Sequence, residues 1–146
     1  MIKKVLLAAF IASIFGVIIF YLVCDLLGNQ IVLKGAYQAS ESVWRNPALL
    51  TRDPHRLLKF FTAFFLTNIV WAYVFSLREK SFEGSGVQKG ISFFFLFWIL
   101  CVPVHLWSWV IIPYPKKIML YNVLVYYLIL FLATGAVIGK VCSEEK

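Results

Sequence analysis

Four long apolar segments constrain the fold of this chain more than any other feature. They cover residues 5–23, with a continuation to about 27, and residues 57–77, 91–112 and 118–139. Each meets the length of about 20 residues that an apolar helix needs to cross the hydrocarbon layer of a bilayer. A helix also satisfies its own backbone hydrogen bonds, as lipid requires. Because the segments are continuously apolar, whereas the strands of a membrane barrel alternate, the sequence predicts an all-α protein with four transmembrane helices.

The composition supports this prediction. Of the 146 residues, 62% are hydrophobic and 14% are charged, whereas a soluble domain is about 45–50% apolar and about 25% charged. One small core cannot bury so much apolar surface. The formal net charge of +7 would suggest nucleic acid in a soluble protein. Here most Lys and Arg residues lie at the ends of apolar segments, where they anchor helices at lipid headgroups. We therefore expect a lipid bilayer, and no nucleic acid, as partner.

Local signals predict where the helices begin and end. Asp53-Pro54 is typical of a helix start, because Asp caps free N–H groups and Pro fits the first turn. Ser85 with Gln88 three residues later matches a capping box, so the third helix is expected to begin near residue 86. Pro113-Tyr114-Pro115 ends that helix, since X-Pro units disfavour it. The prediction is a single transmembrane domain, residues 1–146, with an up-down-up-down bundle of helices at about 5–27, 54–77, 86–112 and 118–140.

Residues 28–53 form the only sizeable segment predicted outside the membrane. It mixes charged side chains such as Lys34 and Glu41 with apolar ones such as Trp44 and Leu49. This mixture is typical of a segment that lies on the membrane surface. A polar loop with incidental apolar residues explains the same composition, and both interpretations stay open.

The positive-inside rule does not determine the orientation by total count. If both termini share one side, seven basic residues lie on each side: Lys3, Lys4, Arg78, Lys80, Lys89, Lys140 and Lys146 with the termini, and Lys34, Arg45, Arg52, Arg56, Lys59, Lys116 and Lys117 opposite. The first helix often dominates orientation, and it begins with two lysines and no acid. The sequence therefore favours cytoplasmic termini, with the first segment kept as a helix rather than removed as a signal peptide.

Three polar side chains lie within the predicted helices: Asn68, His105 and Asn122. Ionisable groups inside a membrane are costly, so function is the first hypothesis for His105. It would bind a haem or chlorophyll metal, or relay protons. The alternative, which we favour, is that His105 is neutral and hydrogen-bonded to a neighbouring helix. Asn122 is a candidate partner, because the antiparallel third and fourth helices place it in the same half of the bilayer as His105. Pro103 is expected to kink the third helix, because proline removes one backbone hydrogen bond. The kink either lines a cavity or serves helix packing.

Glycines mark two further features. Gly135 and Gly139 form a G-x-x-x-G pair, which lets helices approach closely. The polar linker between helices two and three holds several glycines that suit a tight turn. The helix start after this linker is a candidate anion or lipid-headgroup site, with Lys80, Ser85, Gly86 and Lys89 as its residues.

The linker Phe82-Glu83-Gly84-Ser85-Gly86, the later Gly90 and a helix ending in Pro-x-Pro resemble an uncharacterised family of small bacterial four-helix integral membrane proteins. In that family an aromatic-Glu-Gly-x-Gly linker joins helices two and three, and a Trp-Arg pair, here Trp44-Arg45, precedes helix two. The resemblance implies four helices and a bacterial inner membrane, and it implies no activity. This chain departs from the family in its more aromatic third helix, whose Phe93, Phe94, Phe95, Phe97 and Trp98 go round the helix and are expected to contact lipid or a hydrophobic partner.

No catalytic constellation is visible in the sequence. There are no paired carboxylates, no nucleophile with a base and no metal cluster, and Cys24, Cys101 and Cys142 form no C-x-x-C pair. We therefore expect no catalytic residues, cofactor or metal, and a non-catalytic accessory or scaffolding subunit that packs against a larger membrane protein complex. The first alternative is a small oligomeric transporter or channel that uses the kinked third helix. The second is a membrane enzyme or a pigment- or quinone-binding protein.

Overall fold

The computed structural model describes residues 1–33, 54–111 and 116–143. These residues are helical apart from short turns, and no strand occurs among them. Four helices are long and apolar enough to cross a membrane: Ile2–Val32, Arg56–Ser81, Gly86–Trp107 and Lys116–Cys142. They comprise α1 (Ile2–Ile19) with its π-helical continuation η1 (Phe20–Val32), α3 (Arg56–Arg78) with a short turn η3 (Glu79–Ser81), and α4 (Gly86–Ile111). The fourth of these helices consists of α5 (Lys116–Tyr121), a π-helical stretch η4 (Asn122–Tyr127) and α6 (Leu128–Cys142).

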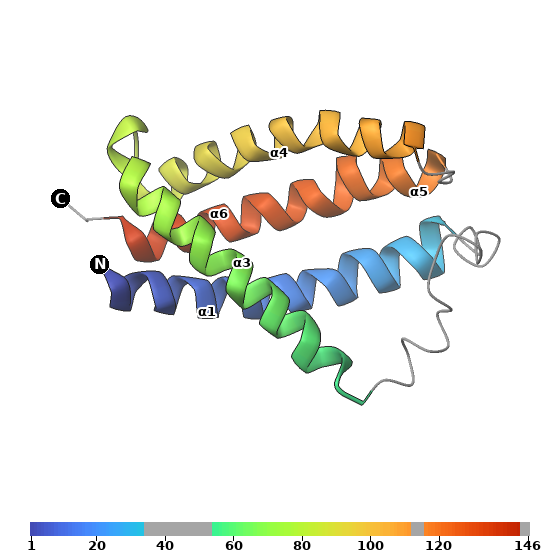
Figure 1. Ribbon diagram of the computed structural model, residues 1–146, viewed down its shortest axis with the longest axis horizontal. Coiled ribbons are helices and arrows are strands. Elements are labelled where there is room, and N and C mark those ends of the chain that lie inside the picture. Colours follow the sequence, from blue (N-terminus) through green and yellow to red (C-terminus); the bar gives the residue numbers. More distant parts are fainter. Residues whose placement is uncertain (34–53, 112–115, 144–146) are drawn as a thin grey trace.

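Helices α4 and α6 make the most extensive contact between described elements, and they lie side by side in Figure 1. Gly86 faces Gly139 and Gly90 faces Gly135, so the two helices run in opposite directions. A Cβ atom added to Gly90 would overlap the Gly135 carbonyl oxygen, and one added to Gly139 would overlap that of Gly86. These four residues, called the glycine seam below, bring the two backbones together as small residues do between membrane helices.

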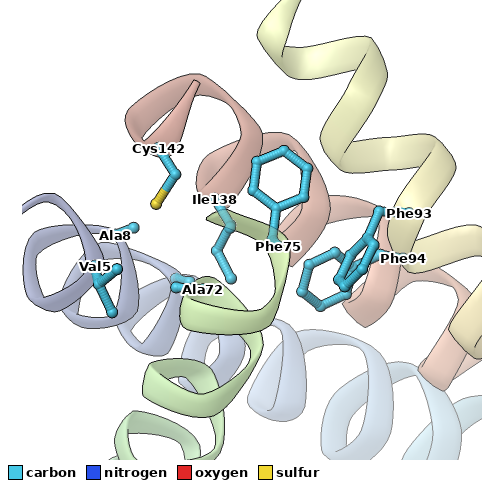
Figure 2. Packing of buried hydrophobic residues seen from close by; sticks show 9 residues of the cluster. Val5, Ala8, Ala72, Phe75, Phe93, Phe94, Ile138 and Cys142 are labelled. Carbon is cyan, nitrogen blue, oxygen red and sulfur yellow. The ribbon is translucent and has the colours of Figure 1, made fainter. Parts of the chain in front are cut away.

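Helix α1 packs against both α3 and α6. Its inner face carries Ala8 and Ala12, which are fully buried and leave room for the larger side chains of the neighbouring helices. The main buried cluster joins these alanines to Phe75 of α3, Phe94 of α4 and Ile138 of α6, as Figure 2 shows. Edge-to-face aromatic contacts extend it between α3 and α4, where the Trp71 and Phe97 ring centroids are 4.3 Å apart.

Helix α3 crosses the bundle obliquely. Both halves of α3 pack against the first helix, with Phe60 next to Phe20 and Asn68 bonded to Ser13. The C-terminal half also packs against α4, whereas the N-terminal end lies far from α4 and α6 (Figure 1). Both chain ends that the structure describes lie at the end of the bundle where α3 joins α4.

Two predicted boundaries differ from the observed ones. The first helix continues past residue 27 to Val32, because Gly28 does not end it: this glycine stays helical with the Tyr121 ring against it, and an added Cβ would lie 2.7 Å from Tyr121 Cε1. The second helix begins at Arg56 after His55, which makes no side-chain cap bond. Its expected cap Asp53 lies outside the described residues, as do Pro113-Tyr114-Pro115 and most of the predicted surface segment.

The predicted capping box at the start of α4 is confirmed. The Ser85 N–H donates to Gln88 Oε1 at 2.8 Å, and the Gln88 N–H donates to Ser85 Oγ at 3.4 Å. Phe93 and Phe94 of α4, which were expected to contact lipid or a hydrophobic partner, are only 4% and 0% exposed and pack inside this chain against Phe75 of α3 and Phe131 of α6. Only Phe95 of this run is largely exposed, because the neighbouring helices α3 and α6 cover the other side of α4.

Candidate functional site

An open pocket of about 1050 Å³ lies at the end of the bundle where α3 turns into α4 and α6 ends. Its wall combines basic, acidic, hydroxyl and glycine residues, namely Glu79, Lys80, Phe82, Glu83, Gly84, Ser85, Gly86, Val87, Lys89, Lys140 and Ser143. All four residues that the sequence indicated as a headgroup site line it. The structure therefore brings Lys80, Ser85, Gly86 and Lys89 together at one place.

The turn between α3 and α4 forms one side of the pocket. Gly84 has φ +98°, a left-handed conformation that strongly favours glycine. An added Cβ there would also lie 2.5 Å from Gln88 Oε1. The capping box then uses the N–H groups of Ser85 and Gln88, while those of Gly86 and Val87 belong to the first turn of α4, which has no intrahelical acceptors for them.

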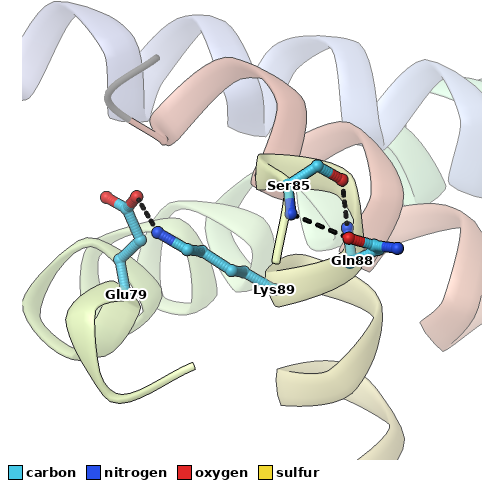
Figure 3. A network of polar contacts seen from close by, with 4 residues as sticks. All are labelled: Glu79, Ser85, Gln88 and Lys89. Atoms are coloured by element: carbon cyan, nitrogen blue, oxygen red, sulfur yellow. Dashed lines mark hydrogen bonds and ion pairs between the residues drawn. The ribbon is translucent and has the colours of Figure 1, made fainter. Parts of the chain in front are cut away.

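An ion pair lies beside this turn. Lys89 Nζ is 3.2 Å from Glu79 Oε1, and the two side chains are only 21% and 11% exposed (Figure 3). Partial burial weakens solvent screening of such a pair. The pair links the end of α3 to the first turns of α4, and it also means that the charge of Lys89 is largely balanced by Glu79.

Ser143 closes the opposite side of the pocket. The residue is 6% exposed, and its Oγ is buried without a hydrogen-bond partner among the described residues. The hydroxyl lies beside the first residue of α4, since a Cβ on Gly86 would be 2.9 Å from Ser143 Oγ. Buried polar atoms usually have a partner, so this hydroxyl is an available donor at the start of α4.

Sequence reasoning missed Glu79, Lys140 and Ser143 as pocket residues. Lys140 and Ser143 could have been found from the spacing Gly86-x-x-x-Gly90, which is the same as that of Gly135-x-x-x-Gly139. Pairing the two motifs in opposite directions places the residues after Gly139 next to the start of α4. The glycines of the linker were instead explained by a tight turn and, for Gly86, by a headgroup site at the helix start.

The structure places His105 far from this pocket. Its Nδ1 is 2.8 Å from the Cys101 carbonyl oxygen, which accepts if Nδ1 carries the proton. Its ring centroid is 4.8 Å from that of Tyr127 on η4. No group of three His, Cys, Asp or Glu side chains suited to a metal occurs in the described parts of the chain. Pro103 is exposed on the outside of α4, which continues through it.

The remaining polar candidates lie apart from each other and from the pocket. Asn68 Nδ2 donates to Ser13 Oγ at 3.2 Å, and Ser13 Oγ donates to the Ala9 carbonyl at 2.6 Å. Both side chains are buried between α3 and α1. Asn122 is the first residue of η4, and the ring contact of His105 is with Tyr127 of the same stretch.

In comparisons with protein-family models, curated proteins and solved structures, nothing matches this chain significantly. The resemblance to small bacterial four-helix membrane proteins therefore stays a prediction. The class that the fold defines is an all-helical protein with four helices long and apolar enough to span a membrane. A hypothesis about function has to come from the residues themselves.

Proposed function

We propose that this chain is a bacterial inner-membrane protein of four transmembrane helices and serves as a non-catalytic accessory subunit of a larger membrane protein complex. Its helices would alternate in direction across the bilayer, with both termini in the cytoplasm. The observation that carries the proposal is an exposed, regularly spaced apolar face on α3.

The charge-free length of the helices supports insertion into a bilayer. In the first helix, α1 with η1, no charged residue occurs between Lys4 and Asp25, a separation of about 32 Å at 1.5 Å per residue. Between Lys117 and Lys140 the corresponding length is about 34 Å, again at 1.5 Å per residue. Both match a hydrocarbon layer of about 30 Å.

The exposed face of α3 supports a protein partner. Leu66, Val70, Tyr73 and Leu77 are 47–60% exposed, and their spacings of four, three and four residues are those of a helix-packing seam. We propose that an apolar transmembrane helix of the partner packs along this α3 seam.

Photo-crosslinking in native membranes tests the seam. A photoreactive residue at Leu66 or Val70 is expected to give one adduct with a defined partner protein. The matched control is the same residue at Leu96 or Leu100 of α4, which are 50% and 65% exposed and are expected to give mainly lipid adducts. The proposal fails if seam and control positions give the same lipid-only pattern.

Extraction in a mild detergent, followed by native-gel mass analysis, distinguishes the main alternatives. An accessory subunit is expected to migrate in a larger heteromeric assembly. A symmetric oligomer of 16.8 kDa chains would favour a small transporter or channel, in which the exposed Pro103 of one copy faces another copy. A lone monomer would contradict both functions. The second alternative is a membrane enzyme or a pigment- or quinone-binding protein, and a bound pigment or quinone would be recognised by its absorption spectrum.

A further inference from the structure

The buried hydroxyl of Ser143 takes no part in the proposed contact between α3 and a partner protein. This side chain is about nine-tenths buried and lines the pocket at the start of α4. Its Oγ has no hydrogen-bond partner among the residues that the structure describes. A buried donor in that position is expected to have an acceptor, which the described chain does not provide.

The start of α4 supplies further donors to the same place. The first turn of a helix leaves four N–H groups without intrahelical acceptors. The capping box satisfies those of Ser85 and Gln88, and the N–H groups of Gly86 and Val87 remain. Gly86 lies directly against Ser143 and Gly139, whose atoms fill the space that a side chain on Gly86 would take, so the start of α4 is next to the Ser143 hydroxyl. Backbone N–H groups at a helix start favour an anion.

The charges of the wall are compatible with an anion. Lys80, Lys89 and Lys140 line the pocket together with Glu79 and Glu83, and Lys89 balances Glu79 in an ion pair. Lys80 is exposed at the rim, next to the turn. The C-terminal end of the antiparallel α6 lies nearby, and its negative dipole end opposes the positive dipole end at the start of α4. The preference of the pocket for an anion therefore depends on the lysine side chains and the Ser143 hydroxyl.

We infer that this pocket binds a phosphate oxyanion through the Ser143 hydroxyl, the N–H groups of Gly86 and Val87, and the Lys80 ammonium group. The phosphate belongs either to the headgroup of an anionic lipid or to free phosphate. This site does not depend on the proposed protein partner, because none of its residues belongs to the α3 seam.

The test uses the purified full-length chain in two arms. In the lipid arm, the protein is placed in nanodiscs of phosphatidylcholine with phosphatidylglycerol, and native mass spectrometry counts the retained phosphatidylglycerol. In the second arm, inorganic phosphate is titrated onto the protein in a non-ionic detergent and followed by calorimetry. Saturable binding in the first arm identifies a lipid source, and binding in the second identifies free phosphate.

Two variants and two matched controls assign the binding to the pocket. Ser143→Ala is expected to lower phosphate or lipid affinity about tenfold, as for loss of a hydrogen bond to a charged group. Lys80→Gln is expected to lower it about threefold, as for an exposed ion pair. Ser92→Ala and Lys117→Gln change an exposed serine of α4 and an exposed lysine at the start of α5, and they are expected to leave the affinity unchanged.

A folding readout separates binding from damage. Because the Ser143 hydroxyl has no acceptor among the described residues, Ser143→Ala is expected to unfold at the same or a higher temperature in phosphatidylcholine alone. The inference is overturned if neither arm shows saturable binding, or if both pocket variants bind like their controls.

Discussion

At the scale of single residues, the buried polar pair between α1 and α3 shows how polar groups are accommodated inside an apolar bundle. Asn68 donates to Ser13, whose own proton goes to the Ala9 carbonyl. Each group thus has a partner away from water, where an unsatisfied amide is costly. The sequence identified Asn68 as an intramembrane polar residue. It could not identify Ser13 as the partner, because one sequence does not fix which faces of α1 and α3 meet.

The Ser13–Asn68 bond is expected to contribute a small, measurable coupling. Interhelical bonds in membranes average about 0.6 kcal/mol and reach about 1.7 kcal/mol. A double-mutant cycle of Ser13→Ala and Asn68→Ala, measured by reversible unfolding in mixed micelles, should give a coupling in this range. Ser13→Ala should cost more than the coupling, since it removes the partner of the buried Asn68 amide. Asn68→Ala leaves the Ser13 hydroxyl bonded to the Ala9 carbonyl and should cost less. A coupling indistinguishable from zero would show that the two helices are held by apolar packing alone.

His105 is expected to serve packing rather than ligand binding. The His105 side chain already has partners within the chain, since its Nδ1 contacts the Cys101 carbonyl and its ring contacts Tyr127. The purified protein should therefore show no visible absorption band, and His105→Leu should cost about 1 kcal/mol or less in unfolding free energy. The exposed His55 at the start of α3 provides the control, His55→Leu. A coloured band that disappears only in His105→Leu would establish a cofactor ligand instead.

At the scale of elements, the predictable part was the length and apolarity of each helix, and the unpredictable part was which face meets which neighbour. Gly135 and Gly139 were recognised from their spacing, but Gly86 and Gly90 were assigned to the turn. Helix α4 is aromatic all round, so its sequence cannot distinguish Phe93 and Phe94, which are buried, from Phe95, which is exposed. Which of these side chains is buried depends on where the neighbouring helices pack.

The π-helical stretches were also beyond the reach of the sequence. In η1 the Val23 carbonyl accepts a bond from the Tyr121 hydroxyl at 2.5 Å. In η4 the Val123 carbonyl accepts one from Trp98 Nε1 at 2.7 Å. Wide turns of this kind disturb the regular i→i−4 pattern, and here both coincide with bonds from side chains of other helices. Such bonds join residues far apart in the chain, which no local pattern reveals.

The glycine seam makes a prediction about helix packing. Gly90→Ala would place its Cβ against backbone atoms of Gly135 and Gly139, which cannot move without separating α4 from α6. We expect a loss of about 2 kcal/mol or more in unfolding free energy, as for overpacked sites. The matched control is Gly16→Ala, whose Cβ would meet only the Phe64 ring at 3.2 Å. That ring can shift, and alanine favours the helix, so this variant should be nearly neutral. Equal effects of the two changes would argue against the seam.

At the scale of the whole molecule, the arrangement of charges separates the two ends of the bundle. The end with the described termini carries Lys3 and Lys4 of α1 and the α3–α4 turn, and the other end carries Lys116 and Lys117 of α5. The sequence predicted this separation from segment lengths, but its equal count of basic residues left the orientation to the two lysines that begin the first helix. The pocket, by contrast, needed the folded chain, since it joins the α3–α4 turn to the end of α6.

Chemical labelling of the two ends tests the proposed orientation. In a chain whose native cysteines are replaced by Ala, single cysteines are introduced as Ser81→Cys and Lys117→Cys, both at exposed positions. A charged maleimide cannot cross the hydrocarbon layer, because removing a charge from water is costly. With cytoplasmic termini, the reagent should modify Lys117→Cys from the outside of intact cells or spheroplasts, and Ser81→Cys only after lysis. The reverse pattern would invert the orientation while keeping four spans. Labelling of both positions from one side would rule out the alternating arrangement, because Ser81 and Lys117 are separated by the whole length of α4.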